Sequence, residues 1–138
     1  MVLAASVHEE MIAAGLDAWP LEACGLLAGP PPSGDGDDAT IEAHYPTENA
    51  SRSARVYSVA PRDLLRADRE AEDAGMALLG VWHSHTHTDA WPSPTDIAQA
   101  PDPAWHYVLV SLRDTHPVVR SYRIHDGLIE EEPVALQW

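Results

Sequence analysis

Apolar residues recur at helical spacing in two long stretches of the chain. The first pattern stops at Pro20 and predicts a helix over residues 7–18, for which the sequence SVHE at residues 6–9 has the form of a capping box. The second predicts a helix over residues 61–75, with a proline at its start and a glycine at its end. A shorter helix is predicted over residues 94–100, before a further proline.

Between these helices lie short segments, apolar or alternating, that are typical of β-strands. They cover residues 22–28, 40–45, 55–59, 77–82, 105–111, 118–125 and 128–134. Asp126-Gly127 has the residues of a tight hairpin turn, and residues 29–39, GPPPSGDGDDA, have the composition of an exposed loop. This order predicts an α/β (α+β) fold in which helices cover a mixed, mainly antiparallel sheet.

Size and charge narrow the class of protein. The 138 residues suffice for one core, so we expect a single domain over residues 1–138. Eight arginines, with no lysine, stand against 22 acidic residues and give a formal net charge of −14. Such a surface repels phosphate backbones and anionic lipid, so nucleic acid and membrane are not expected partners. The chain has one cysteine, and it shows neither an apolar run long enough to cross a membrane nor a basic leader segment. These features predict a cytoplasmic location.

A pair of histidines marks the candidate chemistry. His83 and His85 lie two residues apart at the end of a predicted strand, so their side chains leave the sheet on the same face. Neutral imidazoles are good ligands for a divalent metal, and Asp96 supplies an oxygen if the loop returns to them. Two nitrogen ligands and one oxygen ligand leave a fourth tetrahedral position for water, as in catalytic zinc sites.

Two simpler explanations compete with a metal site. Most His-X-His pairs on protein surfaces bind nothing, and Ser93-Pro94-Thr95-Asp96 is also a good helix start with proline in the first turn. The full pattern of His-X-His, seven residues, Ser, two residues and Asp is expected only about 0.002 times by chance in a chain of this composition. That rarity favours a functional site.

The segment HSHTHTDAWPSPTD, with a glutamate upstream, resembles the signature of the JAMM (MPN+) metalloproteases. The resemblance extends over nearly the whole chain, and EACG, HSHT and the stretch from HYVLVS to SYRIHDG are most similar to the bacterial, Mec-type members. It implies the JAMM/MPN fold, which is of the cytidine-deaminase-like type, and one Zn²⁺ per chain held by His83, His85 and Asp96. The motif matches at five positions: Glu22, His83, His85, Ser93 and Asp96.

The resemblance also implies roles for residues that do not bind the metal. Glu22 would act as the general base, and its place before an apolar strand is costly for a charge without a partner. Ser93 would donate a hydrogen bond to the oxyanion; as a helix cap alone it would affect stability and not turnover. Trp91, in the loop beside the metal, is expected to line the channel for a substrate tail.

Other residues near the motif are expected to have structural roles. Ser84 points to the face opposite the histidines and supports the loop, whereas His87 and Asp89 are interpreted as solvated loop residues. Thr86 stands where many members of the family have proline, which changes only the shape of the loop. Cys24, in an apolar strand, is interpreted as an inert core residue.

Mec-type members of the family remove the cysteine attached to the Gly-Gly tail of a small ubiquitin-like sulfur carrier, a step of cysteine biosynthesis. The expected function is therefore a zinc peptidase that hydrolyses the bond after such a tail. One alternative keeps the chemistry and is an isopeptidase that removes ubiquitin-like modifiers from protein lysines. A third is a non-catalytic MPN scaffold, which the intact set of metal ligands argues against.

Overall fold

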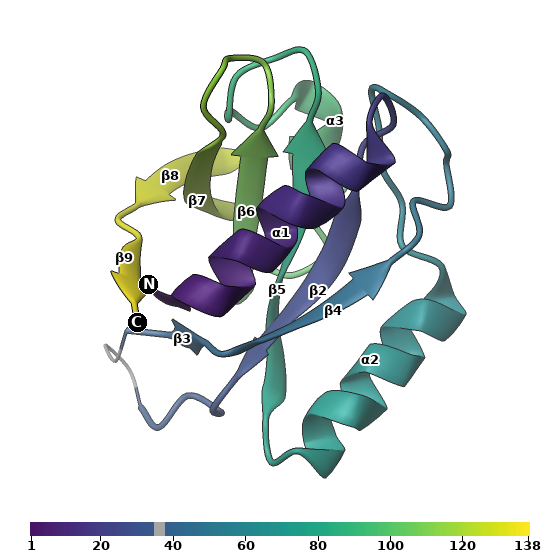
Figure 1. Ribbon diagram of the computed structural model, residues 1–138. Coiled ribbons are helices and arrows are strands. Elements are labelled where there is room, and N and C mark those ends of the chain that lie inside the picture. The colour runs from purple at the N-terminus through teal and green to yellow at the C-terminus, as the bar shows by residue number, and fades with distance from the viewer. Residues whose placement is uncertain (35–37) are drawn as a thin grey trace.

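The computed structural model describes residues 1–34 and 38–138, in which three helices and nine strands follow one another (Figure 1). The helices are α1 (Ala5–Ala18), α2 (Pro61–Asp73) and α3 (Pro94–Ala98). The strands are β1 (Val2–Ala4), β2 (Cys24–Gly29), β3 (Thr40–Ile41), β4 (Ala43–Thr47), β5 (Ala77–His85), β6 (His106–Ser111), β7 (Val118–His125), β8 (Leu128–Glu132) and β9 (Ala135–Gln137).

The main sheet has the strand order β4-β2-β5-β6-β7-β8. Its central pair, β5 and β6, is parallel, and its other neighbouring strands are antiparallel. A small second sheet joins β3, β1 and β9 through parallel pairs beside the chain ends (Figure 1). The predicted mixed, mainly antiparallel sheet is confirmed, and its central strand β5 carries both histidines of the motif.

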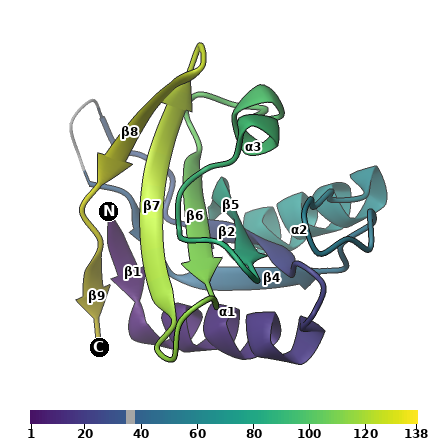
Figure 2. The same ribbon diagram turned by 90° about the horizontal axis from the view of Figure 1, so that it is seen from above.

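Alternation of side chains along the strands divides the core into two halves. On one face of the sheet, Trp82 and Val108 pack with Met11 of α1. On the other face, Val81 packs in a second cluster with Ala67 of α2. Figures 1 and 2 show α1 on one side of the sheet and α2 and α3 on the other. The result is a three-layer arrangement in which the sheet lies between helices.

Helices α1 and α2 begin in different ways. As predicted, α2 starts with a proline, and it ends before Gly75, whose φ of +74° is the left-handed conformation that favours glycine. In contrast, α1 starts at Ala5 without a side-chain cap, so the predicted capping box at residues 6–9 is wrong. The reason is that β1 is paired between β3 and β9, and the helix follows directly from that strand.

Several strand predictions need correction. The strand predicted over residues 40–45 is divided into β3 and β4, which lie in different sheets. Residues 55–59 form no strand, because the side chain of Asn49 binds their backbone at Val56 and Ser58. β5 continues beyond the predicted end at residue 82 and ends at His85, so both histidines lie at the end of this strand, as predicted. The predicted strand over residues 128–134 ends at Glu132, and the chain then enters β9.

The predicted loop over residues 29–39 begins one residue later than expected, because Gly29 is the last residue of β2. Residues 30–34 and 38–39 form neither helix nor strand, as predicted. Residues 35–37 lie outside the described residues.

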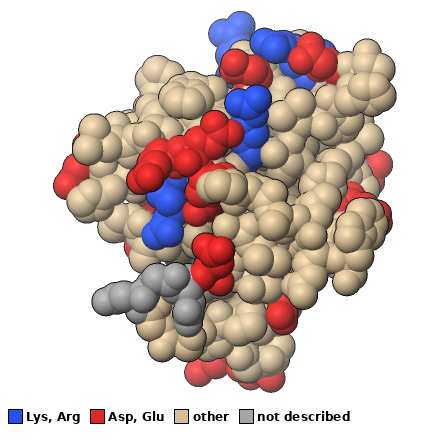
Figure 3. Space-filling model, turned by 90° about the vertical axis from the view of Figure 1, so that its left-hand side faces the viewer, with Lys and Arg blue, Asp and Glu red and all other residues tan. Residues whose placement is uncertain are grey.

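Acidic side chains are spread over the surface among a smaller number of arginines. Figure 3 shows both signs of charge on the face where β8 and the chain ends lie, and Arg120 and Glu131 approach to 3.8 Å across β7 and β8. No helix in the described parts of the chain combines the length and the apolar character needed to cross a membrane.

Candidate metal centre and active site

Strand register brings Glu22 and the two histidines together. Cys24 pairs with His83 across the antiparallel strands β2 and β5, so the residue two positions before Cys24, which is Glu22, lies opposite His85. His83 and His85 point to the sheet face that α2 and α3 cover. Ser84 points to the other face, where its Cβ lies beneath α1.

Three candidate ligand atoms meet at the end of β5. The Nε2 atoms of His83 and His85 are 3.1 Å apart, and Oδ2 of Asp96 lies 3.2 Å from the first and 3.1 Å from the second. Bonds of about 2.0–2.1 Å to a tetrahedral zinc ion separate ligand atoms by about 3.3–3.4 Å. The triangle therefore has nearly the dimensions of three metal ligands.

Hydrogen bonding around His85 fits a cation at this triangle. Its Nδ1 lies 2.7 Å from the carbonyl oxygen of Asp89, which only accepts, so Nδ1 carries the proton. Nε2 then faces Asp96 Oδ2 at 3.1 Å. The positive charge between these two atoms is either a proton on the imidazole, which donates to the carboxylate, or a metal ion that both atoms bind. The donor set, two imidazole nitrogens and one carboxylate oxygen, thus suits a divalent metal.

Asp96 is held in place by the first turn of α3. Its Oδ2 accepts the N–H of Ser93 at 2.8 Å, and Ser93 Oγ accepts the N–H of Asp96 at 3.1 Å, which together form a capping box. Burial alone would raise the pKa of Asp96, but hydrogen bonds to His83 and His85 outweigh it and hold the pKa well below its usual range. The helix cap and the metal ligand are therefore compatible, because one geometry provides both.

Glu22 joins the cluster from the segment before β2. Its side chain is only 3% exposed, and a carboxylate oxygen lies within 4.8 Å of ring nitrogens of His83 and His85. Its Oε1 has no hydrogen-bond partner among the described residues. Burial raises the pKa of Glu22 to about 7, although the charge of His85 acts in the opposite direction. A buried carboxylate without a partner is costly, so this oxygen is oriented toward a group that the described residues do not supply.

Backbone hydrogen bonds fix the segment that carries Glu22. The N–H of Ala23 donates to Ser84 Oγ at 2.8 Å, and the N–H of Ser84 donates to the Ala23 carbonyl at 2.9 Å. On the other side, the amide of Asn49 donates to the Glu22 carbonyl at 3.1 Å, and the N–H of Glu22 donates to the Ser53 carbonyl at 2.8 Å. Ser84 was expected to support the histidine loop, but it binds the glutamate segment instead.

The loop after β5 is held through its backbone carbonyls. Ser111 donates from Oγ to the Thr88 carbonyl at 2.6 Å, and the hydroxyl of Tyr122 donates to the Ala90 carbonyl. His85 Nδ1 binds the carbonyl oxygen of Asp89, which lies between Thr88 and Ala90 in the chain. Because consecutive carbonyls are bound, the loop is fixed where it contacts the histidine.

Other residues of the loop are placed largely as expected. His87 and Asp89 are exposed, and the ring of His87 contacts that of Trp19 at 4.9 Å. Thr86 is buried and donates from Oγ1 to a carbonyl of the neighbouring loop. Cys24 is buried in β2, as predicted.

Trp91 does not line the same cavity as Glu22. It is 50% exposed and packs edge-on against Tyr122, with ring centroids 5.4 Å apart. Together with Arg113 and Arg120 it lines a neighbouring hollow of about 250 Å³. Trp91 was expected in a channel beside the metal, but it lies outside the cavity at Glu22, and its role in binding a substrate tail stays a prediction.

Two residues that support the site were missed by sequence reasoning. Tyr57 stacks on the ring of His83 with centroids 4.2 Å apart, and Asn49 binds the backbone around Glu22. No spacing rule connects residue 57 with residue 83, and the expectation of a strand over residues 55–59 hid this loop.

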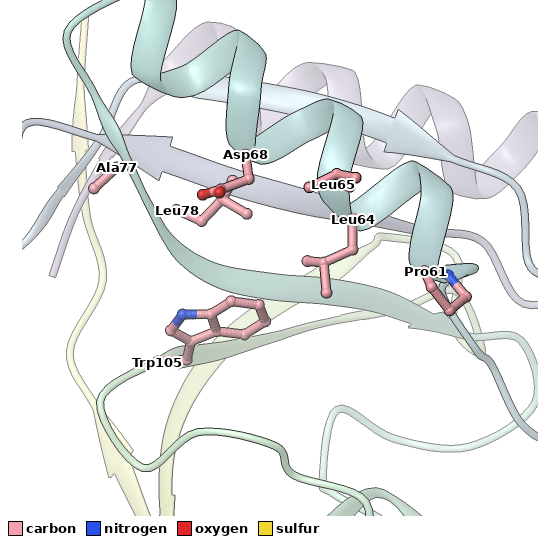
Figure 4. Close-up of a pocket in the computed structure, with 7 residues that line it drawn as sticks. All are labelled: Pro61, Leu64, Leu65, Asp68, Ala77, Leu78 and Trp105. Atoms are coloured by element: carbon pink, nitrogen blue, oxygen red, sulfur yellow. The ribbon is translucent and has the colours of Figure 1, made fainter.

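Glu22, His85 and Ser93 open onto a cavity of about 540 Å³. The other residues that line it come from two loops: Ala54, Arg55, Thr86, His87 and Thr88. A separate hollow of about 580 Å³ lies between α2 and the start of β5, far along the strand from the histidines (Figure 4). Asp68 is the one ionisable side chain among the residues that line this second hollow. The titratable groups needed for catalysis therefore gather at the first cavity.

Comparison with known proteins gives one consistent result. Residues 4–125 match the family described as prokaryotic homologs of the JAB domain. The chain is 44% identical to the CysO-cysteine peptidase of Mycobacterium tuberculosis over 135 residues, which cover 97% of this chain and 89% of that protein. It is 36% identical to the desampylase of Haloferax volcanii over 93 residues, 67% of this chain and 63% of the relative.

Solved structures agree with this result. The solution structure of protein DSY2949 from Desulfitobacterium hafniense matches with a TM-score of 0.89 and 37% identity, over 99% of this chain and 93% of the other. The residues matched to the family include Glu22 and the whole motif from His83 to Asp96. The chain therefore belongs to the prokaryotic branch of the JAB (JAMM/MPN) domain family.

Proposed function

We propose that this single-domain protein is a zinc-dependent peptidase that hydrolyses the bond after the C-terminal Gly-Gly of a small ubiquitin-like sulfur carrier and releases cysteine. The observation that carries the proposal is the buried Glu22 carboxylate, which has an unpartnered oxygen beside three atoms spaced like metal ligands. Relatives named CysO-cysteine peptidase and desampylase support a ubiquitin-like protein as the partner.

His83, His85 and Asp96 would hold one Zn²⁺ per chain. When bound, zinc lowers the pKa of a coordinated water from 15.7 to about 7. Burial lowers the pKa of His83, so its ring is neutral at pH 7, which is the form that binds a metal. A set of two nitrogens and one oxygen is typical of catalytic zinc, whereas structural zinc is usually closed by four protein ligands.

Glu22 acts as the general base in this proposal. Its carboxylate takes a proton from the attacking water and delivers it to the nitrogen that leaves when the C–N bond breaks. Burial raises the pKa of Glu22 toward the neutral range, in which a carboxylate both accepts and releases a proton readily. The hydrogen bonds at Ala23 and Asn49 hold the carboxylate at the cavity.

Ser93 donates a hydrogen bond to the oxyanion that forms when water attacks the carbonyl. Its Oγ accepts the N–H of Asp96 and keeps its own O–H available as a donor. Capping the helix and stabilising the oxyanion therefore use different parts of one hydroxyl. Removal of a single oxyanion donor typically lowers kcat by ~10²–10³.

A second candidate function keeps this chemistry and changes the leaving group. The similarity to a desampylase supports an isopeptidase that removes ubiquitin-like modifiers from protein lysines. A non-catalytic scaffold is less well supported, because it has no use for a buried, unpartnered carboxylate beside a complete set of ligands.

The proposal is tested by the intact mass of a sulfur carrier that ends in Gly-Gly-Cys, before and after incubation with the zinc-loaded protein. We expect the carrier to lose one cysteine residue. The variant Glu22→Ala should leave the carrier unchanged, whereas Glu42→Ala, which removes an exposed carboxylate, should cleave it normally.

The possible negative results have different meanings. No mass change in a protein that binds one zinc per chain would contradict the sulfur-carrier substrate and favour lysine-linked modifiers. No mass change and no bound zinc would contradict the enzyme as a whole. Cleavage that persists in Glu22→Ala would contradict the role of the base.

A further inference from the structure

Arg55 is the one arginine among the residues that line the cavity at Glu22. We infer that Arg55 binds the free α-carboxylate of the amino acid that is released, and so selects substrates in which this residue ends the chain. This inference rests on the proposed function and adds the means by which the leaving group is recognised. Arg55 faces the same space as Glu22, His85 and Ser93, the groups proposed to surround the reacting bond.

The charge of Arg55 is not used within the protein. Its guanidinium forms no hydrogen bond or ion pair with another described residue, whereas Arg66, Arg113 and Arg120 each lie within 4 Å of a carboxylate. Arg52, Arg62 and Arg69 also form no such contact with a described residue, but none of them lines the cavity at Glu22. A guanidinium matches a carboxylate with two parallel hydrogen bonds, so an unpaired one at a cavity is suited to an anionic ligand.

The loop that carries Arg55 is attached to the catalytic segments on both sides. The N–H of Glu22 donates to the Ser53 carbonyl at 2.8 Å, and Thr86 Oγ1 donates to the Ala54 carbonyl at 3.3 Å. Within the loop, Ser53 Oγ accepts the N–H of Arg55 at 3.0 Å. These bonds reach the residues just before β2 and just after β5. Arg55 is therefore presented from a fixed backbone position beside the site.

The two candidate substrates differ in the group that Arg55 would meet. Cysteine joined through its amino group to the carrier has a free α-carboxylate one carbon away from the nitrogen that leaves. A lysine in an isopeptide bond has a methylene chain at that place instead. Hydrolysis adds one water, breaks the C–N bond and leaves this carboxylate unchanged. Arg55 therefore contributes by binding and orienting the substrate, and its charge favours release of a terminal amino acid.

The test compares two forms of one carrier, which end in Gly-Gly-Cys with either a free carboxylate or a carboxamide. We expect the zinc-loaded wild type to cleave the free acid with a kcat/KM about 10- to 100-fold higher than the amide. In Arg55→Gln, kcat/KM for the free-acid carrier should fall to the value for the carboxamide carrier, and the latter value should not change. Arg55→Lys should recover part of the difference. Arg52→Gln, which removes an exposed arginine of the same loop that does not line the cavity, is the matched control.

A binding measurement separates recognition from turnover. In the inactive Glu22→Gln background, the acid carrier should bind more tightly than the amide, and adding Arg55→Gln should abolish the preference. Equal cleavage of acid and amide by the wild type would overturn the role of Arg55 and leave the peptidase proposal intact. An equal loss of kcat/KM on both carriers in Arg55→Gln would also overturn the role of Arg55 and leave the peptidase proposal intact. Cleavage of neither carrier would contradict both the proposed function and this inference.

Discussion

The aromatic ring of Tyr57 stacks on the imidazole of His83, with centroids 4.2 Å apart and planes inclined by 19°. Tyr57 belongs to the loop before α2, and His83 lies within the central strand β5. The contact covers one face of a candidate metal ligand, so it restricts the orientations of the imidazole. Residues that orient a ligand in this way affect metal affinity without touching the metal.

Loss of the stacking ring should weaken metal binding. We expect Tyr57→Leu to lower the affinity for Zn²⁺ about 10-fold or more, while Tyr57→Phe, which keeps the ring, binds zinc like the wild type. Competition with a chromophoric chelator measures both affinities. A Tyr57→Leu variant with unchanged affinity would show that stacking does not orient His83.

Removal of the Ser84 hydroxyl should destabilise the protein. Ser84→Ala leaves the buried N–H of Ala23 without its acceptor, and such a group costs about 1–3 kcal/mol. Urea unfolding gives the free energy directly. Ser58→Ala is the control, since it breaks an exposed hydrogen bond with Ser51, and we expect a change within about 0.5 kcal/mol. Similar unfolding free energies for the two variants would argue against Ser84 as the support of the glutamate segment.

Replacement of Ser93 separates its two proposed roles. Ser93→Ala removes the helix cap and should lower stability by about 1 kcal/mol. If the hydroxyl also stabilises the oxyanion, kcat should fall by ~10²–10³, beyond what a small change in stability explains. Ser93→Thr keeps a hydroxyl and should recover both properties in part. A stability loss with normal kcat would reduce Ser93 to a helix cap.

The raised pKa of Glu22 makes the metal-free protein less stable as pH rises. The ordinary value is 4.5 and the folded value is about 7, so between these limits the unfolded chain has released a proton that the folded chain keeps. The contribution of Glu22 to stability is therefore lost from pH 4.5 to 7 and stays lost above it.

Glu22→Gln removes this titration. In chelator-treated protein, we expect Glu22→Gln to be more stable relative to wild type at pH 8 than at pH 5, as measured by urea unfolding. A stability difference that is the same at both pH values would contradict the assigned burial of this carboxylate. Catalysis by the zinc-loaded protein should also decline at acid pH, as Glu22 and the zinc ligands become protonated.

Features that depend on local sequence could be predicted. The spacing of His83 and His85 requires that they share a face of a strand, and the capping residues before Asp96 determine that a helix begins there. The proline and glycine that bound α2 are equally local signals.

Features that depend on distant pairing could not be predicted. β1 exists because it pairs with β3 and β9, from elsewhere in the chain, and this pairing also displaced the expected cap of α1. Asn49 uses its side chain to bind the backbone around Val56 and Ser58, which replaces the expected strand with a loop. The positions of Tyr57 and Arg55 at the site follow from that loop and from no periodic pattern.

The central claim, hydrolysis with Glu22 as base, is tested most directly by mass spectrometry of a Gly-Gly-Cys carrier treated in water enriched in oxygen-18. With the zinc-loaded wild type, we predict loss of cysteine and one heavy oxygen in the new C-terminal glycine of the carrier. With Glu22→Ala, we predict neither change. Loss of cysteine without the label, or equal labelling in Glu22→Ala, would contradict the account.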